Sequence, residues 1–171
     1  RLDLPGTPQS YRASTDDDGG LQMFVMPGSG YRGTIVPASP ALPITTFPWE
    51  PGDSLELTLD YGVSVYGHAL FEDSAGTRRA LAGASVYVVT QDGVRSTSAI
   101  SDPSGFFHLA VQPGTYTLVC EGREFGQDPV LTVSDLDVPD EGRIYDFVYQ
   151  DNASVVVDGR EIGWLSPGMT Q

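Results

Sequence analysis

The sequence predicts an all-β protein made of antiparallel β-sandwich modules in tandem. Three observations lead to this fold class. The 20 glycines and 13 prolines among 171 residues interrupt the chain too often for a long helix. The apolar residues fall in short runs that alternate with polar residues, which is the period of a strand with one buried face. Segments of the chain also resemble one another at a spacing of 86 residues.

The central part of the chain has the strand spacing of a complete sandwich. Seven short strands with alternating or β-rich composition are typical of this architecture. Their expected ranges are 63–71, 84–90, 94–101, 106–111, 115–121, 129–133 and 143–149. The apolar positions of three of these strands predict the core, which should contain Val86, Val88, Phe107, Leu109, Val111, Tyr116 and Leu118.

An internal repeat predicts the domain organisation. A turn, a strand and a second turn run over residues 102–114, and the same frame occurs over residues 16–28. A shorter similarity relates residues 63–67 to residues 155–159. The expected organisation is the C-terminal part of a first module over 1–61, a complete module over 62–152, and the first strand of a further module, or a tail, over 153–171.

The same motifs carry a family resemblance. The glycine strand Val65-Tyr66-Gly67-His68-Ala69 is followed by a Gly-Ala strand at 81–88, the Asp-x-x-Gly turn that opens 102–114, and the strand Tyr116-Thr117-Leu118. In this order they resemble the carboxypeptidase regulatory-like domain, an immunoglobulin-like, transthyretin-like (prealbumin-like) sandwich. The resemblance covers about half of the chain.

This resemblance implies a fold more than an activity. Members of the family serve as accessory modules in secreted peptidases, carbohydrate-active enzymes, outer-membrane receptors and bacterial surface proteins. A secreted or cell-surface location is therefore expected. The related collagen-adhesin B-type repeats stiffen each module with a lysine–asparagine bond, which this lysine-free chain cannot form.

The charge balance excludes several functions. With 23 acidic and 9 basic residues, the formal net charge is −14. Nucleic acid is not expected as a partner, because its affinity comes from basic residues that neutralise phosphates. Membrane insertion is not expected either, because no apolar run approaches the roughly 18 residues of a spanning helix. Every basic residue is arginine, which removes Schiff-base and phosphate-loop lysine chemistry.

No enzyme and no catalytic residue are expected. His68 and His108 fall on the strand face opposite the core positions, and neither belongs to a ligand motif. Ser29 and Ser104 lie in glycine turns without a neighbouring base. The lone Cys120 occupies an alternating apolar position, which predicts a small core residue rather than a reactive thiol.

Acidic stretches raise the question of a metal. Asp16, Asp17 and Asp18 lead into a glycine, and a second acidic stretch covers residues 135–141, so oxygen ligands for a structural Ca²⁺ are available. Neither stretch has EF-hand spacing. The favoured interpretation is that these aspartates begin turns and charge a solvated loop. No other cofactor is expected.

Two functions remain open. Trp49, Tyr66 and Trp164 lie in or beside loops, where a ring could stack on a sugar or fill a joint between modules. The first expectation is a structural, spacer or adhesive module that contacts a protein at a cell surface. The alternative is a carbohydrate-binding accessory module that contacts a glycan. The proline-rich stretch over residues 37–43 is expected to be a stiff loop or sheet edge rather than an unfolded linker.

The two ends of the chain are expected to leave open sheet edges. The N-terminal unit should lack both the glycine strand and the Gly-Ala strand. Residues 153–158 should pair as a strand, by addition to the open edge of the N-terminal unit of the same or a neighbouring chain. The protein would then be a monomer or a strand-exchanged oligomer. Alternatively, residues 1–15 supply the missing strands and the tail packs on the central module.

Overall fold

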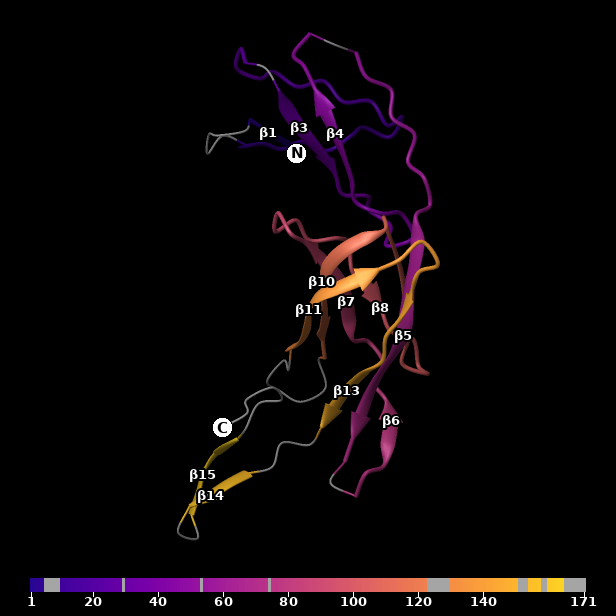
Figure 1. Cartoon of the computed structure of the whole chain (residues 1–171), viewed down its shortest axis with the longest axis vertical. Helices are drawn as coiled ribbons and strands as arrows, with labels where there is room; N and C mark the ends of the chain where they lie inside the picture. The colour runs from indigo at the N-terminus through magenta and orange to yellow at the C-terminus, as the bar shows by residue number, and fades with distance from the viewer. Residues whose placement is uncertain are drawn as a thin grey trace.

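All regular secondary structure in the described part of the chain is β. A computed structural model describes residues 1–4, 10–28, 30–52, 54–73, 75–122, 130–150, 154–157 and 160–164, with side chains described only before residue 150. The predicted all-β class is confirmed, and none of these residues forms an apolar helix long enough to cross a membrane. The chain is elongated, with an N-terminal sheet at one end, a sandwich in the middle and a hairpin at the other end (Figure 1).

The first sheet of the sandwich is organised around strand β5 (Val63–Glu72). Along one side, β5 pairs antiparallel with β9 (Phe106–Val111) and then with β6 (Arg78–Ala80). Along the other side, it pairs parallel with β12 (Arg143–Ile144) and then with β13 (Phe147–Gln150). Every other strand of this sheet therefore hydrogen-bonds to β5.

The second sheet is wholly antiparallel, in the order β11-β10-β7-β8. These strands are β11 (Val130–Val138), β10 (Gly114–Glu121), β7 (Ser85–Thr90) and β8 (Ala99–Ile100). The strand expected over 94–101 is reduced to β8 and a bridge at Arg95. The strand expected over 129–133 is longer, and a register shift lets it continue to Val138 past Asp135, which has a φ of 55°.

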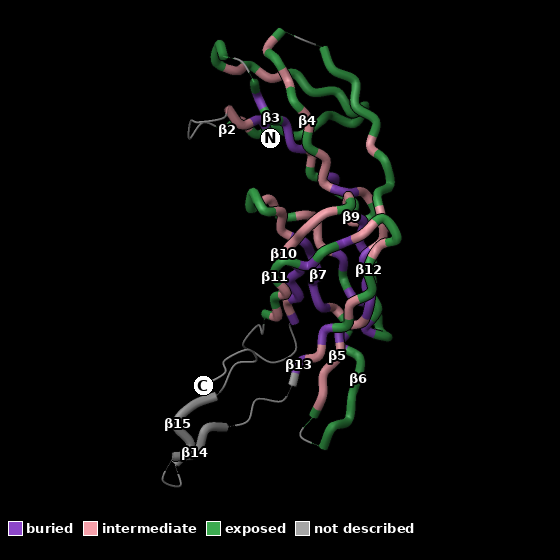
Figure 2. The backbone as a smooth tube through the Cα atoms, in the orientation of Figure 1, coloured by how far each residue is buried: buried purple, intermediate pink, exposed green. Residues whose placement is uncertain are grey.

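The core lies between these two sheets, and it confirms the predicted core residues. Val86, Val88, Phe107, Leu109, Val111 and Leu118 are all buried, and Tyr116 packs against them half-buried. Figure 2 shows the buried backbone concentrated in this middle part of the chain. Cys120 is buried in the same cluster, as predicted. The period-2 alternation of the sequence places these side chains on one face of each strand.

The described residues of the N-terminal unit form a four-stranded sheet in the order β2-β1-β3-β4. Its strands are β2 (Ser10–Tyr11), β1 (Leu2–Asp3), β3 (Tyr31–Ile35) and β4 (Thr45–Trp49). This order matches β8-β7-β10-β11 of the sandwich. The prediction that this unit lacks the Gly-Ala strand is therefore wrong, because β1 lies beside β3 as β7 lies beside β10.

The pairing register of the two sheets also agrees. Leu2 pairs with Gly33, and Val88 pairs with Leu118. Val88 lies 86 residues after Leu2, and Leu118 lies 85 residues after Gly33. β1 has only two residues, which is too short for an alternating pattern to be visible in the sequence. Residues 1–15 thus supply two strands, and one of them, β1, is the equivalent of the Gly-Ala strand. The other, β2, matches β8, so the alternative expectation holds only in part: the described residues of this range contain no equivalent of the glycine strand.

Two hydrogen-bonding details recur in both units. The Oδ1 atom of Asp16 accepts from the backbone N–H groups two and four residues further on, and Asp102 Oδ1 does the same. The Tyr31 hydroxyl donates to the carbonyl of Met26 at 2.8 Å, and the Tyr116 hydroxyl donates to the carbonyl of Gln112 at 2.8 Å. Each of these carbonyls directly precedes a Pro-Gly pair. The sequence similarity therefore reflects the same local structure.

One expected strand is not formed. Residues 21–25 match β9 in sequence, yet they carry no strand, and Leu21 is 52% exposed where the matching Phe107 is 1% exposed. The physical reason lies in the pairing. β9 is held by β5, and no described strand takes that place in the N-terminal unit. An alternating pattern alone does not make a strand without a partner.

The tail forms a strand, but among the described residues it does not pair with the N-terminal unit of its own chain as predicted; pairing with a neighbouring chain stays a prediction. β14 (Ser154–Val157) pairs antiparallel with β15 (Arg160–Trp164), and neither the N-terminal unit nor the sandwich pairs with it. Residues 153 and 158 of the predicted strand lie outside the described residues. Only two residues separate β14 from β15, so closing this hairpin costs far less chain entropy than reaching the opposite end of the molecule.

Leu109→Ala tests the core register. The side chain is fully buried between the sheets, so its truncation should lower the free energy of unfolding by about 2–5 kcal/mol. His108→Ala is the matched control, because this neighbour points outward, and it should cost less than about 1 kcal/mol. Urea unfolding followed by circular dichroism measures both. Equal costs would contradict the register.

A close backbone approach explains the glycine in the middle of β5. A Cβ on Gly67 would overlap the carbonyl oxygen of Tyr145, in the interruption between β12 and β13. At this point the His68 N–H donates to the Asp146 side chain at 2.8 Å instead of to a ladder carbonyl. The interruption lets the edge of the sheet change from β12 to β13 while the β5 backbone stays hydrogen-bonded.

Gly67→Ala should therefore destabilise the sandwich by about 3 kcal/mol or more, since the new methyl group meets backbone rather than a movable side chain. Gly76→Ala provides the comparison. Gly76 has a φ of 78° and open space around it, so only backbone strain of about 1 kcal/mol is expected. Thermal unfolding of both variants measures the difference. A smaller loss for Gly67→Ala than for Gly76→Ala would argue against the close approach.

Candidate functional site

The outer surface of the β5 sheet gathers exposed rings and histidines. Tyr66 and His68 of β5 face His108 and Phe106 of β9, respectively. Phe106 lies 6.3 Å from Tyr66 and 5.7 Å from His68, measured between ring centroids. On the other side of Tyr66, Ile144 of β12 is 63% exposed. We call these five residues the outer aromatic face.

Alternation along β5 and β9 produces this face. The residues between its members, such as Val65 and Phe107, point into the core, so the outward positions are left to rings and polar groups. The prediction that both histidines lie opposite the core is confirmed. Phe106 was not predicted as a surface residue, although its place beside the inward Phe107 is the signal that could have revealed it.

The two histidines have separate polar partners. His68 Nδ1 lies 3.4 Å from Asp146 Oδ1, and His108 Nε2 lies 3.0 Å from Ser64 Oγ. The carboxylate thus contacts one histidine and the serine contacts the other. The arrangement orients the imidazoles on the sheet but does not place acid, base and hydroxyl in one relay.

The structure separates the residues predicted to bind a sugar. Tyr66 lies on the outer aromatic face, whereas Trp49 belongs to β4 in the N-terminal sheet. The Trp49 ring packs edge-on against Tyr31, with centroids 5.8 Å apart, and Tyr31 is buried. Trp164 belongs to β15, and its side chain is outside the described residues. Of the described pair, only Tyr66 presents its ring on this face.

The predicted calcium ligands begin a turn. Asp16 Oδ1 accepts the N–H of Asp18 at 3.1 Å and the N–H of Gly20 at 2.6 Å. The three carboxylates Asp16, Asp17 and Asp18 are exposed. Within the described ranges, no group of three or more His, Cys, Asp or Glu side chains is placed to hold a metal ion. The turn interpretation accounts for Asp16 through its own hydrogen bonds.

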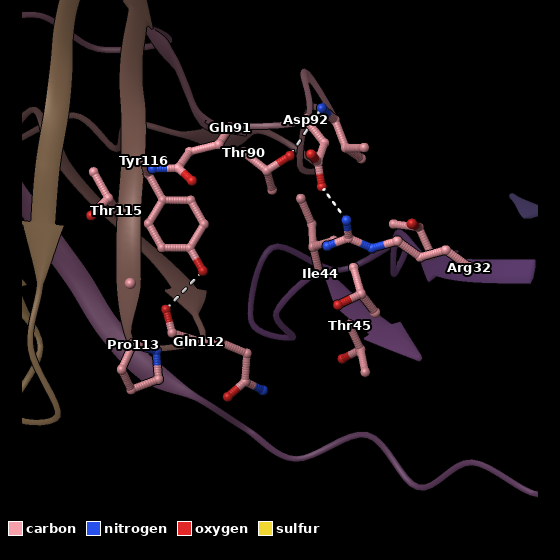
Figure 3. A pocket seen from close by; sticks show the side chains of 14 residues that line it. Arg32, Ile44, Thr45, Thr90, Gln91, Asp92, Gln112, Pro113, Thr115 and Tyr116 are labelled. Atoms are coloured by element: carbon pink, nitrogen blue, oxygen red, sulfur yellow. Dashed lines mark hydrogen bonds and ion pairs between the residues drawn. The ribbon is translucent and has the colours of Figure 1, made fainter. Parts of the chain in front are cut away.

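A polar cleft of about 420 Å³ opens where the N-terminal sheet meets the sandwich (Figure 3). Arg32 of β3 reaches across it to Asp92, in the turn after β7, with Nη1 and Oδ2 2.9 Å apart. The Tyr116 hydroxyl and its acceptor, the Gln112 carbonyl, form one wall. Thr45 and other threonine hydroxyls add further polar groups to the lining. This cleft could not be predicted from the sequence, because its walls come from segments that lie far apart in the chain.

The proline-rich stretch fixes the joint beside this cleft. The carbonyl of Pro37 accepts a hydrogen bond from the Thr97 hydroxyl, and the carbonyl of Pro40 accepts one from the Ala110 N–H at 2.8 Å. Pro43 is fully buried. Residues 37–43 form a loop that is bonded to the sandwich at both of these carbonyls, and its stiffness stays a prediction.

The single cysteine is chemically protected. Burial raises the pKa of the Cys120 thiol to about 11, so the thiol stays protonated at neutral pH. The Tyr149 hydroxyl donates to the Cys120 carbonyl at 2.7 Å, and burial raises the pKa of this phenol as well. Both groups act as neutral core residues.

No protein-family model matches this sequence, and no curated protein matches it significantly. The resemblance to the carboxypeptidase regulatory-like domain therefore stays a prediction about the motifs of residues 62–152. The β-sandwich core and the repeated turns are the structural features that accord with it.

Proposed function

We propose that the chain is a non-catalytic structural and adhesive module of a secreted or cell-surface protein, with another protein as its partner. The observation that carries this proposal is the bonded junction between the N-terminal sheet and the sandwich. A spacer has to hold its two ends at a fixed distance and orientation. A hydrogen-bonded joint between the units can do this, whereas a flexible linker cannot.

Three contacts support the spacer part of the proposal. The Thr97 hydroxyl and the Ala110 N–H hold the proline-rich loop, and the Arg32–Asp92 ion pair joins the two units on the side of the cleft. The ion pair is half exposed and contributes little by itself. The hydrogen bonds to the carbonyls of Pro37 and Pro40 add two further contacts at the same junction.

The outer aromatic face supports the contact part of the proposal. Tyr66, Phe106 and Ile144 expose apolar surface in a chain with a net charge of −14. Exposed aromatic groups of this kind are enriched at the centre of protein–protein interfaces, where tyrosine often carries much of the binding energy. The resemblance to accessory modules of surface proteins points in the same direction.

A carbohydrate-binding role is the second candidate. The neighbouring Tyr66 and Phe106 rings could stack on the apolar face of a sugar, and Ser64 with His108 could bond its hydroxyl groups. Against this role, the ring pair lies on an open sheet face, whereas small ligands are usually held in concave sites. The protein-contact role is therefore preferred.

The junction can be tested by residual dipolar couplings. In the unmodified chain, couplings from β1–β4 and from the sandwich should fit one alignment tensor, because the units are held together. The double variant Arg32→Gln/Thr97→Val removes the ion pair and the hydroxyl donor. We expect its N-terminal unit to show a reduced and different alignment. Thr132→Val on the exposed face of β11 is the control. Two different tensors in the unmodified chain would refute the spacer role.

A glycan array separates the two functions. The contact proposal predicts no glycan bound above background, and a Tyr66→Ala stability loss below about 1 kcal/mol because the ring is partly exposed. Tyr61→Ala, at an exposed tyrosine of the loop before β5, is the matched control. A glycan that binds the unmodified chain and Tyr61→Ala but not Tyr66→Ala would establish the carbohydrate role instead.

A further inference from the structure

The outer surface of the second sheet carries an aromatic ring that an arginine of the same chain covers. Tyr87 of β7 lies between the core residues Val86 and Val88, so its ring points outward. The guanidinium carbon of Arg95 lies 3.5 Å from the centroid of this ring. Both side chains contact one carboxylate, because the Tyr87 hydroxyl donates to Glu121 Oε1 at 2.7 Å and Arg95 Nη2 lies 3.9 Å from Glu121 Oε2. With this cover, Tyr87 is only 8% exposed.

The outer aromatic face of the first sheet has exposed rings without such a cover. Tyr66 and Phe106 are each 36% exposed. Among the described side chains, no guanidinium lies over either of these two rings. They therefore keep the exposure that Tyr87 loses beneath Arg95.

Two carboxylates lie beside these rings. Asp146, in the interruption between β12 and β13, accepts the His68 N–H at 2.8 Å, and its side chain is 50% exposed. Asp102, in the turn before β9, accepts the Phe106 N–H at 3.0 Å. Hydrogen bonds from Ser104 and Phe106, together with the charge of His68, hold the pKa of the Asp102 carboxyl below its usual value. Neither carboxylate forms an ion pair with an arginine of the described part of the chain.

We propose that the outer aromatic face is a docking site for an arginine side chain of a partner protein, whose guanidinium lies against the exposed rings and pairs with the Asp146 carboxylate. The proposal rests on the protein-contact role and names the chemistry of the partner. Arginine combines a planar cation, which stacks on aromatic rings, with donors that bind carboxylates. Arg95 supplies this combination within the chain on the other outer face of the sandwich.

The charge of the chain favours the same partner. Its formal net charge is −14, so a segment that carries arginine is attracted over a long range, whereas an acidic segment is repelled. Asp146 and Asp102 add a local attraction at the face itself. A second copy of this chain fits less well, because two copies of this charge repel each other. The observations therefore favour a different protein with an exposed arginine.

The probe is the peptide Ser-Arg-Ser-Arg-Ser with blocked ends. Its control carries citrulline in place of both arginines, which keeps the shape of the side chain and removes the charge. Each peptide is titrated into the full isotope-labelled chain at about 0.15 M salt and followed by heteronuclear NMR. The arginine peptide should bind at least about fivefold tighter than the citrulline peptide. The largest shifts should fall on Tyr66, His68 and Phe106.

Two variants separate the contributions of the ring and the carboxylate. Phe106→Leu keeps an apolar side chain but removes the ring. Asp146→Asn removes the charge, while its amide oxygen can still accept the His68 N–H. Each variant should weaken binding of the arginine peptide about threefold.

Asp135→Asn is the matched control for charge. It removes an exposed carboxylate from β11 in the other sheet. Asparagine also tolerates the positive φ of this position, so the fold should be kept. The affinity for the arginine peptide should not change.

Three results would overturn the proposal. Equal affinities for the two peptides would remove the requirement for a cation, and this comparison on the unmodified chain holds even if Asp146→Asn unfolds. Shifts away from the outer aromatic face, or an equal loss in Asp135→Asn, would show attraction to the net charge alone. Self-association of the chain that the arginine peptide disperses would make a second copy the occupant. The dipolar couplings report on the spacer role separately, so the arginine site can fail while the module function stands.

Discussion

Strand β5 is the constraint on which the sandwich depends. Among the described strands, it is the only one that hydrogen-bonds to β6, β9, β12 and β13, so the first sheet exists only while β5 is in place. Its glycine allows the sheet edge to change from β12 to β13, and its alternation creates both the core face and the outer aromatic face. In the N-terminal unit, β5 has no described equivalent, and residues 21–25, which match β9 in sequence, carry no strand.

Local features of this fold could be predicted from the sequence, and non-local ones could not. The Asp102 turn and the strands around Leu109 and Leu118 depend on residues close in the chain, so turn chemistry and alternation were sufficient. β1 was missed because two residues carry no period. The strand at 21–25 was predicted wrongly, because its pattern is correct but its partner is not among the described strands.

In the candidate site, too, the local features could be predicted from the sequence and the non-local ones could not. Alternation placed His68 and His108 outside the core, and the structure agrees. Tyr66, which was expected in or beside a loop, lies instead in the middle of β5. The association of Tyr66 with Phe106 depends on the β5–β9 register, which spans about forty residues and leaves no trace in the sequence. The cleft at the junction is still less accessible to sequence reasoning, since Arg32, Asp92 and Tyr116 meet only after both sheets are assembled.

The parallel pairing of β5 with β12 and β13 has a mechanical consequence. β5 begins at the junction, and β13 ends on the side of the hairpin, so tension along the chain pulls these neighbouring strands in opposite directions along their own length. Their hydrogen bonds are then loaded in shear and share the force, whereas the antiparallel hairpin of β14 and β15 would open one bond at a time. Under load, the tail hairpin yields first and the sandwich retains its length.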